Sequence, residues 1–220
     1  MQKIKLTLAA AALITALPLL QGCVPVVIGG AAAGVMSAYD RRSTGVQTDD
    51  ETTEWKAAQR IPEKFKAASH VNFTAYNHRV LITGEVPSEE AKGIVGEQTR
   101  QVPGVTEIFN ELNIAPASGY SNRSNDSYIT SKLKARLVDS NQLSANHIKV
   151  VTENGIVYLM GIVTEREAKV AVAIARTTDG VRRVVNIMEV VTEGDTRRID
   201  TSAVGSSRTP PPQTAPVETR

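Results

Sequence analysis

Residues 147–169 read HIKVVTENGIVYLMGIVTEREAK, and this stretch decides the fold. Two β-rich runs, residues 148–152 and 156–163, flank Asn154 and Gly155. Asn-Gly between two such runs is a strong signal of a β-hairpin, because a type I′ turn needs a positive φ angle at both central residues. The stretch therefore predicts two antiparallel strands joined by a tight turn.

The chain on either side of the hairpin predicts two helices and a third strand. The capping box that starts at Thr164 predicts a helix over residues 164–177, and residues 181–191 are rich in β-formers. Upstream, Asn125 or Asp126 is expected to cap another helix. Its apolar stripe recurs at i, i+4 and i+8: Ile129, Leu133 and Leu137. The element order is α-β-β-α-β.

The same pattern occurs earlier in the chain. Residues 70–92 read HVNFTAYNHRVLITGEVPSEEAK and align with residues 147–169 at an offset of 77. The first copy is expected to contain a helix at 50–60, strands at 70–76, 79–86 and 105–114, and a helix at 88–101. We therefore predict an α+β chain of two tandem αββαβ domains, each a small three-stranded mixed sheet with two helices on one face.

The second hairpin strand indicates how the two copies interact. Residues 156–163 are apolar on both faces of the expected strand. A domain of about 65 residues buries little surface and is only marginally stable alone. Contact between the two copies and a covered back face of residues 156–163 are therefore expected.

The first 23 residues predict an export signal. Lys3 and Lys5 precede a charge-free apolar run at residues 6–20, which is short for a membrane-spanning helix. The run ends in LQGC at residues 20–23, which resembles the bacterial lipobox. By that resemblance the mature chain starts at Cys23, which carries an N-acyl group and an S-diacylglycerol; no other cofactor is expected.

Two other interpretations of Cys23 are an ordinary secretory signal and a free structural thiol. Cys23 is the only cysteine, so no intramolecular disulfide can form. A lone cysteine directly after an apolar run favours acylation, and three acyl chains would anchor the chain permanently. Val24, rather than aspartate, follows the cysteine, and by the resemblance this implies sorting to the inner leaflet of the outer membrane.

The flanks of the repeat are expected to lack a fold. Residues 24–38 are rich in Gly and Ala, and the end of the chain is rich in Thr, Ser and Pro. The expected organisation is a signal peptide at 1–22, a lipidated cysteine and tether at 23–49, domains at 50–116 and 125–193, and a disordered tail at 194–220.

Composition and motifs exclude several functions. A net charge of +2 with 41% apolar residues does not suit a nucleic-acid binder. No C-x-x-C, H-E-x-x-H or P-loop motif is present, so neither an enzyme nor a metal site is expected.

His70 and His147 are equivalent in the two copies, which favours a structural role for both, and His78 falls at the first turn. Residues 50–115 hold seven Lys or Arg against ten Asp or Glu, so the first copy is acidic. Residues 126–193 hold nine Lys or Arg against eight Asp or Glu, so the second copy is nearly neutral.

Two αββαβ copies after a lipobox resemble the dual BON-domain lipoproteins of the bacterial outer membrane. The resemblance extends from the lipobox to about residue 193 and includes loop residues. It rests on residues 153–169, on Arg42-Ser43, Gly45, Gln47 and Asp49-Asp50, and on Asn125-Asp126 with Ile129-Thr130. It implies a non-enzymatic protein on the periplasmic face of the outer membrane that supports envelope integrity and localises to division sites. Its second domain would bind anionic phospholipid through the first helix.

The residues of that helix agree in part with lipid binding. Tyr128, Lys132 and Arg136 recur at i, i+4 and i+8 beside the core stripe, and Lys134 lies on the flank. An aromatic ring beside cations suits a headgroup region, although a solvated helix face has the same pattern. The family carries tryptophan at the position of Tyr128. A second hypothesis stays open: the acidic first copy would make the protein an adaptor for outer-membrane assembly proteins.

Overall fold

The computed structural model describes residues 40–205, with side chains to residue 201. These residues form an α+β structure of two αββαβ units, which confirms the predicted fold class. Within residues 40–205, no helix combines the length and apolar character that crossing a membrane would need.

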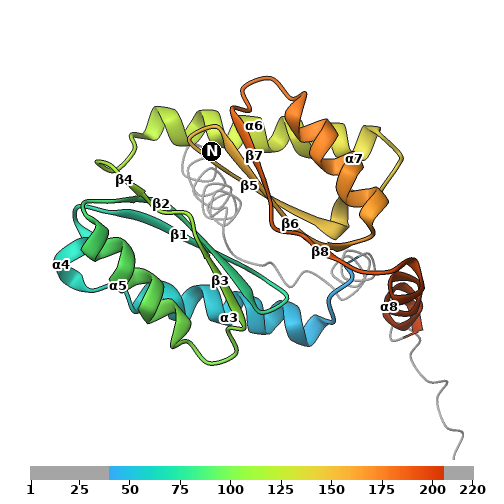
Figure 1. Cartoon of the computed structure of the whole chain (residues 1–220), viewed down its shortest axis with the longest axis horizontal. Coiled ribbons are helices and arrows are strands. Elements are labelled where there is room, and N and C mark those ends of the chain that lie inside the picture. Colours follow the sequence, from blue (N-terminus) through green and yellow to red (C-terminus); the bar gives the residue numbers. More distant parts are fainter. Residues whose placement is uncertain (1–39, 206–220) are drawn as a thin grey trace, which may run out of the picture. The chain divides into compact units, whose positions relative to one another are not determined.

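The first unit is built on a mixed sheet. Strands β1 (His70–Tyr76) and β2 (Arg79–Val86) form the antiparallel hairpin, and β2 pairs in parallel with β3 (Glu107–Asn110) and β4 (Asn113–Ile114). Its helices are α3 (Thr44–Gln59), the short α4 (Glu63–Lys66) and α5 (Glu89–Arg100). In Figure 1, α3 and α5 lie on the same face of this sheet.

The second unit repeats the arrangement. Antiparallel β5 (Ile148–Glu153) and β6 (Ile156–Val163) are followed by β7 (Arg183–Asn186) and β8 (Glu189–Val190), both parallel to β6. The helices are α6 (Tyr120–Asp139), the 3-10 turn η2 (Ala145–His147), α7 (Glu165–Arg176) and α8 (Glu193–Gly205). Figure 1 shows α6 and α7 on one face of the second sheet.

Local sequence chemistry sets the hairpin turn and the second helix of each unit. Asn154 and Gly155 have φ angles of 50° and 69°, as a type I′ turn requires. Thr164 and Glu167 form both hydrogen bonds of the predicted capping box, and the Ser88 hydroxyl accepts from the Ala91 amide at the equivalent place. The predicted turn at Asn154-Gly155 and the predicted capping box at Thr164 are confirmed.

The third strand of each unit differs from the prediction of one continuous strand. Each is broken into two pieces, and at the break an asparagine side chain accepts a hydrogen bond from the amide two residues later. The Asn110 Oδ1 atom accepts from the Leu112 amide at 3.4 Å, and the Asn186 Oδ1 atom accepts from the Met188 amide at 3.0 Å. A β-rich composition does not reveal such a bend, because the asparagine satisfies the backbone locally.

The first helix of each unit begins earlier than predicted. The helix α3 starts at Thr44 instead of about residue 50, and α6 starts at Tyr120, so the proposed cap Asp126 lies inside the helix. Asp126 is buried and accepts hydrogen bonds from the Asn154 and Gly155 amides, both at 2.8 Å. Its role is therefore to hold the hairpin turn.

The segment before α3 also belongs to the fold, which corrects the prediction of a tether that extends to residue 49. Arg41 is buried and donates to the Ile162 carbonyl at 2.9 Å and to both Glu167 carboxylate oxygens at 2.7 and 3.1 Å. Arg42 pairs with Asp50 at 2.8 Å. Residues 40–49 are thus held by buried ion pairs.

The prediction of a disordered tail is wrong for residues 194–205, which lie in α8. The Thr192 hydroxyl accepts from the Asp195 amide at 3.2 Å, which is a helix N-cap contact. Asp200 of α8 pairs with Arg41 at 3.1 Å. Because Arg41 lies far from Asp200 in the sequence, the composition of the tail alone cannot reveal this ion pair. The predictions for residues 1–39 and 206–220 lie outside the described residues.

The two units share an apolar layer between their sheets. One hydrophobic cluster joins Tyr76 and Leu81 of the first unit to Tyr158, Met160 and Ile162 of β6. All five side chains are buried. The prediction that the back face of residues 156–163 is covered by the other copy is confirmed. Each unit also has its own core between its helices and its sheet.

Candidate functional site

The candidate lipid-binding residues all lie on α6, whose inner face is fixed by the core. Ile129, Leu133 and Leu137 are fully buried against β5, β6 and α7. This inner stripe determines which residues face outward, because side chains on a helix repeat about every 3.6 residues.

The outward face of α6 is an uncharged stripe, which we call the α6 stripe. Its members follow one another at intervals of three or four residues, which is about one helical turn, and all are exposed: Tyr120, Ser124, Tyr128, Ser131, Ala135 and Val138. Tyr120, Tyr128 and Val138 are 83%, 64% and 60% exposed, and exposed apolar groups that gather on one face mark candidate interaction surfaces. The rings of Tyr120 and Tyr128 each carry a cation, from Arg123 at 4.6 Å and Lys132 at 5.9 Å.

Two of the predicted cations are engaged inside the domain. Lys132 donates to Asp179 at 2.7 Å and holds the pKa of that carboxyl below its usual value through the hydrogen bond and its charge. Arg136 donates to the Ile174 carbonyl at 3.1 Å and to the hydroxyls of Thr178 and Thr177 at 2.7 and 3.0 Å. Arg136 therefore ties α6 to the end of α7.

Lys134, which the sequence placed on the flank, is exposed on the opposite edge of the α6 stripe. Among the described residues it forms no hydrogen bond or ion pair. The structure thus brings Tyr128, Lys132 and Lys134 together on the surface of one helix. Arg136 lies deeper and is bound to α7.

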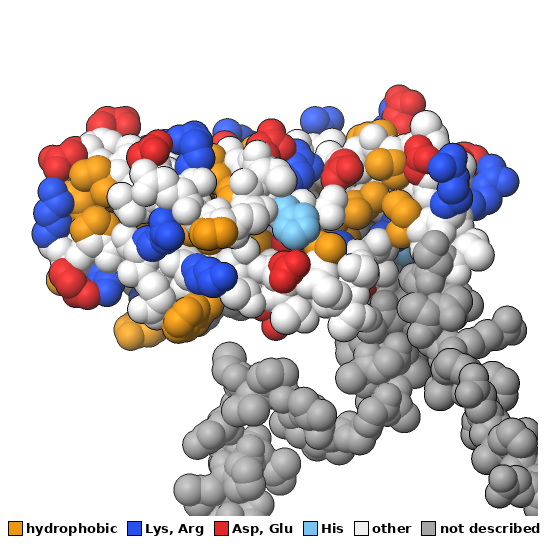
Figure 2. Space-filling model, turned by 90° about the horizontal axis from the view of Figure 1, so that it is seen from below, with side chains coloured by type: hydrophobic (Ala, Val, Ile, Leu, Met, Phe, Trp, Pro, Cys, Tyr) orange, Lys and Arg blue, Asp and Glu red, His pale blue; other side chains and the backbone are white. Residues whose placement is uncertain are grey.

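The helix α3 is the counterpart of α6 in the first unit but has a different surface. Asp49 and Glu51 are exposed where α6 has Asn125 and Ser127. The largest exposed apolar side chain of α3 is Trp55, which is 65% exposed. On the face shown in Figure 2, acidic and basic side chains are interspersed, with no continuous basic field. The outward tyrosine stripe with adjacent lysines is a property of the second unit.

Comparison with known proteins identifies the fold family. The model of the BON domain matches residues 49–116 and 125–192, which are the two repeats. The chain belongs to the BON-domain family. It is a dual-BON protein, and the second BON domain is the one that carries the α6 stripe.

Three relatives show how far this similarity reaches. The chain is 38% identical to outer membrane lipoprotein DolP of Haemophilus influenzae, across 77% of this chain and 89% of that protein. It is 34% identical to the 21 kDa hemolysin of Actinobacillus pleuropneumoniae, across 69% and 79%. It is 31% identical to osmotically-inducible protein Y of Escherichia coli, across 49% and 55%. The chain is thus a DolP-like dual-BON protein.

Sequence reasoning missed part of the α6 surface. Tyr120 precedes the predicted start of the helix at Asn125 or Asp126, and Val138 lies beyond the last residue of the predicted Tyr128, Lys132 and Arg136 face. The signal was present in the spacing: residues 120 and 138 are 18 apart, which is five turns of an α-helix. Cys23, the predicted lipidation site, lies outside the described residues.

Proposed function

We propose that this protein is a lipid-anchored outer-membrane lipoprotein whose second BON domain binds anionic phospholipid through α6. The anchor is the diacylglycerol on Cys23, on the periplasmic face of the membrane. Similarity to outer membrane lipoprotein DolP over most of both chains supports the location. The observation that supports lipid contact is the exposed α6 stripe.

The contact works through two complementary parts of the helix. The rings of Tyr120 and Tyr128 enter the headgroup region, where an aromatic side chain with one polar end is favoured. Lys134 then lies at the depth of the lipid phosphates, and a cation at an anionic surface contributes about 1 kcal/mol. The acidic α3 of the first domain is repelled by the same surface, so the second domain approaches it.

Vesicle binding tests this contact. The chain from Val24 onward, without acyl groups, is mixed with phosphatidylglycerol vesicles and sedimented. Tyr128→Glu should weaken binding roughly tenfold or more, since a loss of 1.4 kcal/mol already corresponds to tenfold. Lys134→Glu should act in the same direction, and raised salt should weaken wild-type binding.

Trp55→Glu provides the matched control, because it places the same charge at an exposed aromatic position of α3. Its binding should equal that of the wild-type chain. Equal loss in the Trp55 and Tyr128 variants, or undiminished binding by Tyr128→Glu, would show that α6 is not the contact.

The role in the cell follows from this weak second contact. The anchor keeps the chain in the outer membrane, and α6 selects regions rich in anionic lipid, including division sites. There the protein supports envelope integrity. A fluorescent fusion carrying Tyr128→Glu should stay in the envelope but lose enrichment at division sites; retained enrichment would contradict this part of the proposal.

A further inference from the structure

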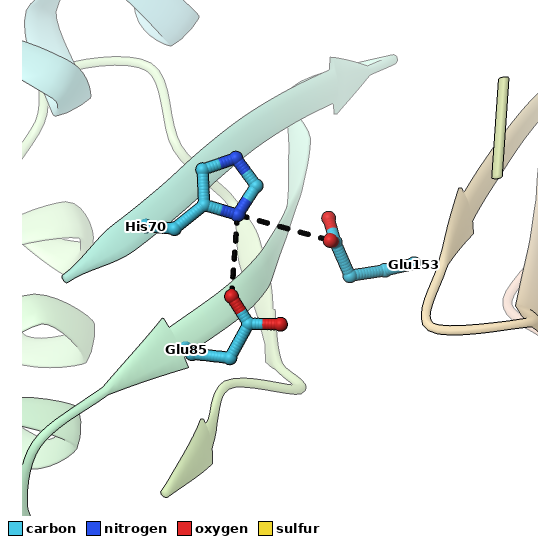
Figure 3. Close-up of side chains that lie close together, drawn as sticks. All are labelled: His70, Glu85 and Glu153. Carbon is cyan, nitrogen blue, oxygen red and sulfur yellow. Dashed lines mark hydrogen bonds and ion pairs between the residues drawn. The ribbon is translucent and has the colours of Figure 1, made fainter. Parts of the chain in front are cut away.

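A second cluster of functional groups lies where the two BON domains meet. Figure 3 shows His70 of β1 and Glu85 of β2, both from the first domain, directed toward Glu153 of β5 in the second. The His70 Nδ1 atom lies 3.3 Å from Glu85 Oε2 and 3.8 Å from Glu153 Oε1. One donor atom from each side chain lies within 4.8 Å of the other two.

The two carboxylates are buried with little positive charge to balance them. Glu85 is 2% exposed and Glu153 is 4% exposed. Within residues 40–205, the only basic side chain that pairs with either of them is His70. Burying a carboxylate without a counterion is costly, and burying two beside each other adds their repulsion. A divalent cation would remove both costs.

Surrounding amides already orient these carboxylates. Glu85 Oε1 accepts from the Asn154 side chain at 2.6 Å, and its Oε2 accepts from the Ser118 amide at 3.1 Å. Glu153 Oε2 accepts from Asn72 at 3.1 Å. Glu153 Oε1, the atom aimed at His70, receives no hydrogen bond from a described residue. Such outer contacts fix ligand orientation in metal sites.

The donor set and its access indicate the kind of ion. One imidazole nitrogen with two carboxylate oxygens suits Zn²⁺ and related transition metals, whereas Ca²⁺ takes six to eight oxygens. Donors around a tetrahedral Zn²⁺ with bonds of about 2.0–2.2 Å lie roughly 3.4 Å apart, close to the two observed separations. His70 and Glu153 line an open cavity of about 460 Å³, so the cluster borders a space that is open to solvent.

We propose that His70, Glu85 and Glu153 bind a divalent transition-metal ion of the Zn²⁺ class between the two BON domains. The ion would join β1 and β2 to β5 and so lock the domain pair. The second repeat has no matching site, because Ile162 occupies the position equivalent to Glu85. The sequence did not reveal the cluster, since its ligands come from different repeats.

Zinc titration of the full-length protein in detergent tests the proposal. After treatment with a chelator, calorimetry should find one Zn²⁺ per chain, and bound Zn²⁺ should raise the melting temperature. His70→Asn and Glu153→Gln should each lower the affinity at least about tenfold. His78→Asn is the matched control, because it removes a histidine outside the cluster, and it should bind as tightly as the wild type.

A spectroscopic measurement on the wild-type protein tests the proposed zinc ligands even where a variant fails to fold. X-ray absorption of the zinc-loaded protein should show one imidazole nitrogen and carboxylate oxygens at about 2.0–2.2 Å. No stoichiometric zinc, a thiolate or multi-histidine shell, or equal affinity in folded His70 and Glu153 variants would overturn the proposal.

Discussion

At the residue scale, two glycines account for the clearest match between the repeats. Gly84 and Gly161 occupy equivalent positions in β2 and β6, where the neighbouring strand passes at very close range. A Cβ atom on Gly84 would lie 1.9 Å from the His70 carbonyl oxygen, and one on Gly161 would lie 2.3 Å from that of His147. Gly84 also has a φ angle of 112°, which side-chain-bearing residues rarely adopt.

Gly84→Ala should therefore destabilise the protein by about 2–4 kcal/mol, because only backbone movement can relieve the clash. Gly93→Ala is the matched control: it lies on the exposed side of α5 with open space around it. That change should stabilise the protein by about 0.5–1 kcal/mol. Urea unfolding measures both free energies, and effects of the same sign would contradict the prediction.

Other residues show where sequence reasoning stops. The role of Thr164 could be predicted because its hydrogen-bond partner is three residues away. Asp126 has the right chemistry for a helix cap, but its partners are the turn amides 28 and 29 residues later. Lys132 and Arg136 show the same limit for the candidate site, because their partners lie on and just after α7 and the helix period cannot reveal them.

At the scale of elements, the N-terminal segment, α7 and α8 are joined by one ion-pair network. Arg41 connects Glu167 at the start of α7 with Asp200 of α8, and His147 Nδ1 lies 3.8 Å from Glu167 Oε1. Burial and the charge of Arg41 hold the pKa of His147 below its usual value, against the opposing effect of Asp200, Glu167 and Asp40. The His147 Nδ1 atom is buried without a hydrogen bond in the described part of the chain.

This arrangement predicts a loss of stability in mild acid. Below about pH 6.5 His147 binds a proton in the unfolded chain before it does so in the folded one, so the free energy of unfolding falls as the pH is lowered. His147→Gln should give a flatter stability profile between about pH 6.5 and pH 5. Urea unfolding across this range measures the slope, and an unchanged slope would contradict the prediction.

At the scale of the whole molecule, the shared layer between the sheets predicts that the two domains unfold together. The polar contacts across the layer are reciprocal. The turn residue Asn77 donates to Glu189 of the second domain at 2.9 Å, and its counterpart Asn154 donates to Glu85 of the first. Each domain thus completes the other, as the two-sided apolar pattern of β6 indicated.

Leu81→Asp tests this coupling, since it places an unpaired charge in the shared layer. Trp55, the only tryptophan, reports on the first domain by fluorescence, while far-UV circular dichroism reports on both. The two unfolding curves should coincide in the wild type and separate in Leu81→Asp. Val138→Asp, at an exposed site on α6, should leave them coincident. Coincident curves for Leu81→Asp at the wild-type midpoint would argue against the coupling.

The short connection between the domains affects whether neighbouring chains exchange domains at high protein concentration. Only residues 115–119 separate β4 from α6, and the Ser118 amide is held by Glu85. Because the paired faces are nearly equivalent, halves from two chains could exchange partners and form a swapped dimer. The short connection opposes this: it gives each half an effective concentration of its own partner of the order of millimolar. Shortening this linker until it no longer spans the two halves would abolish that intramolecular value and favour exchange between neighbouring chains.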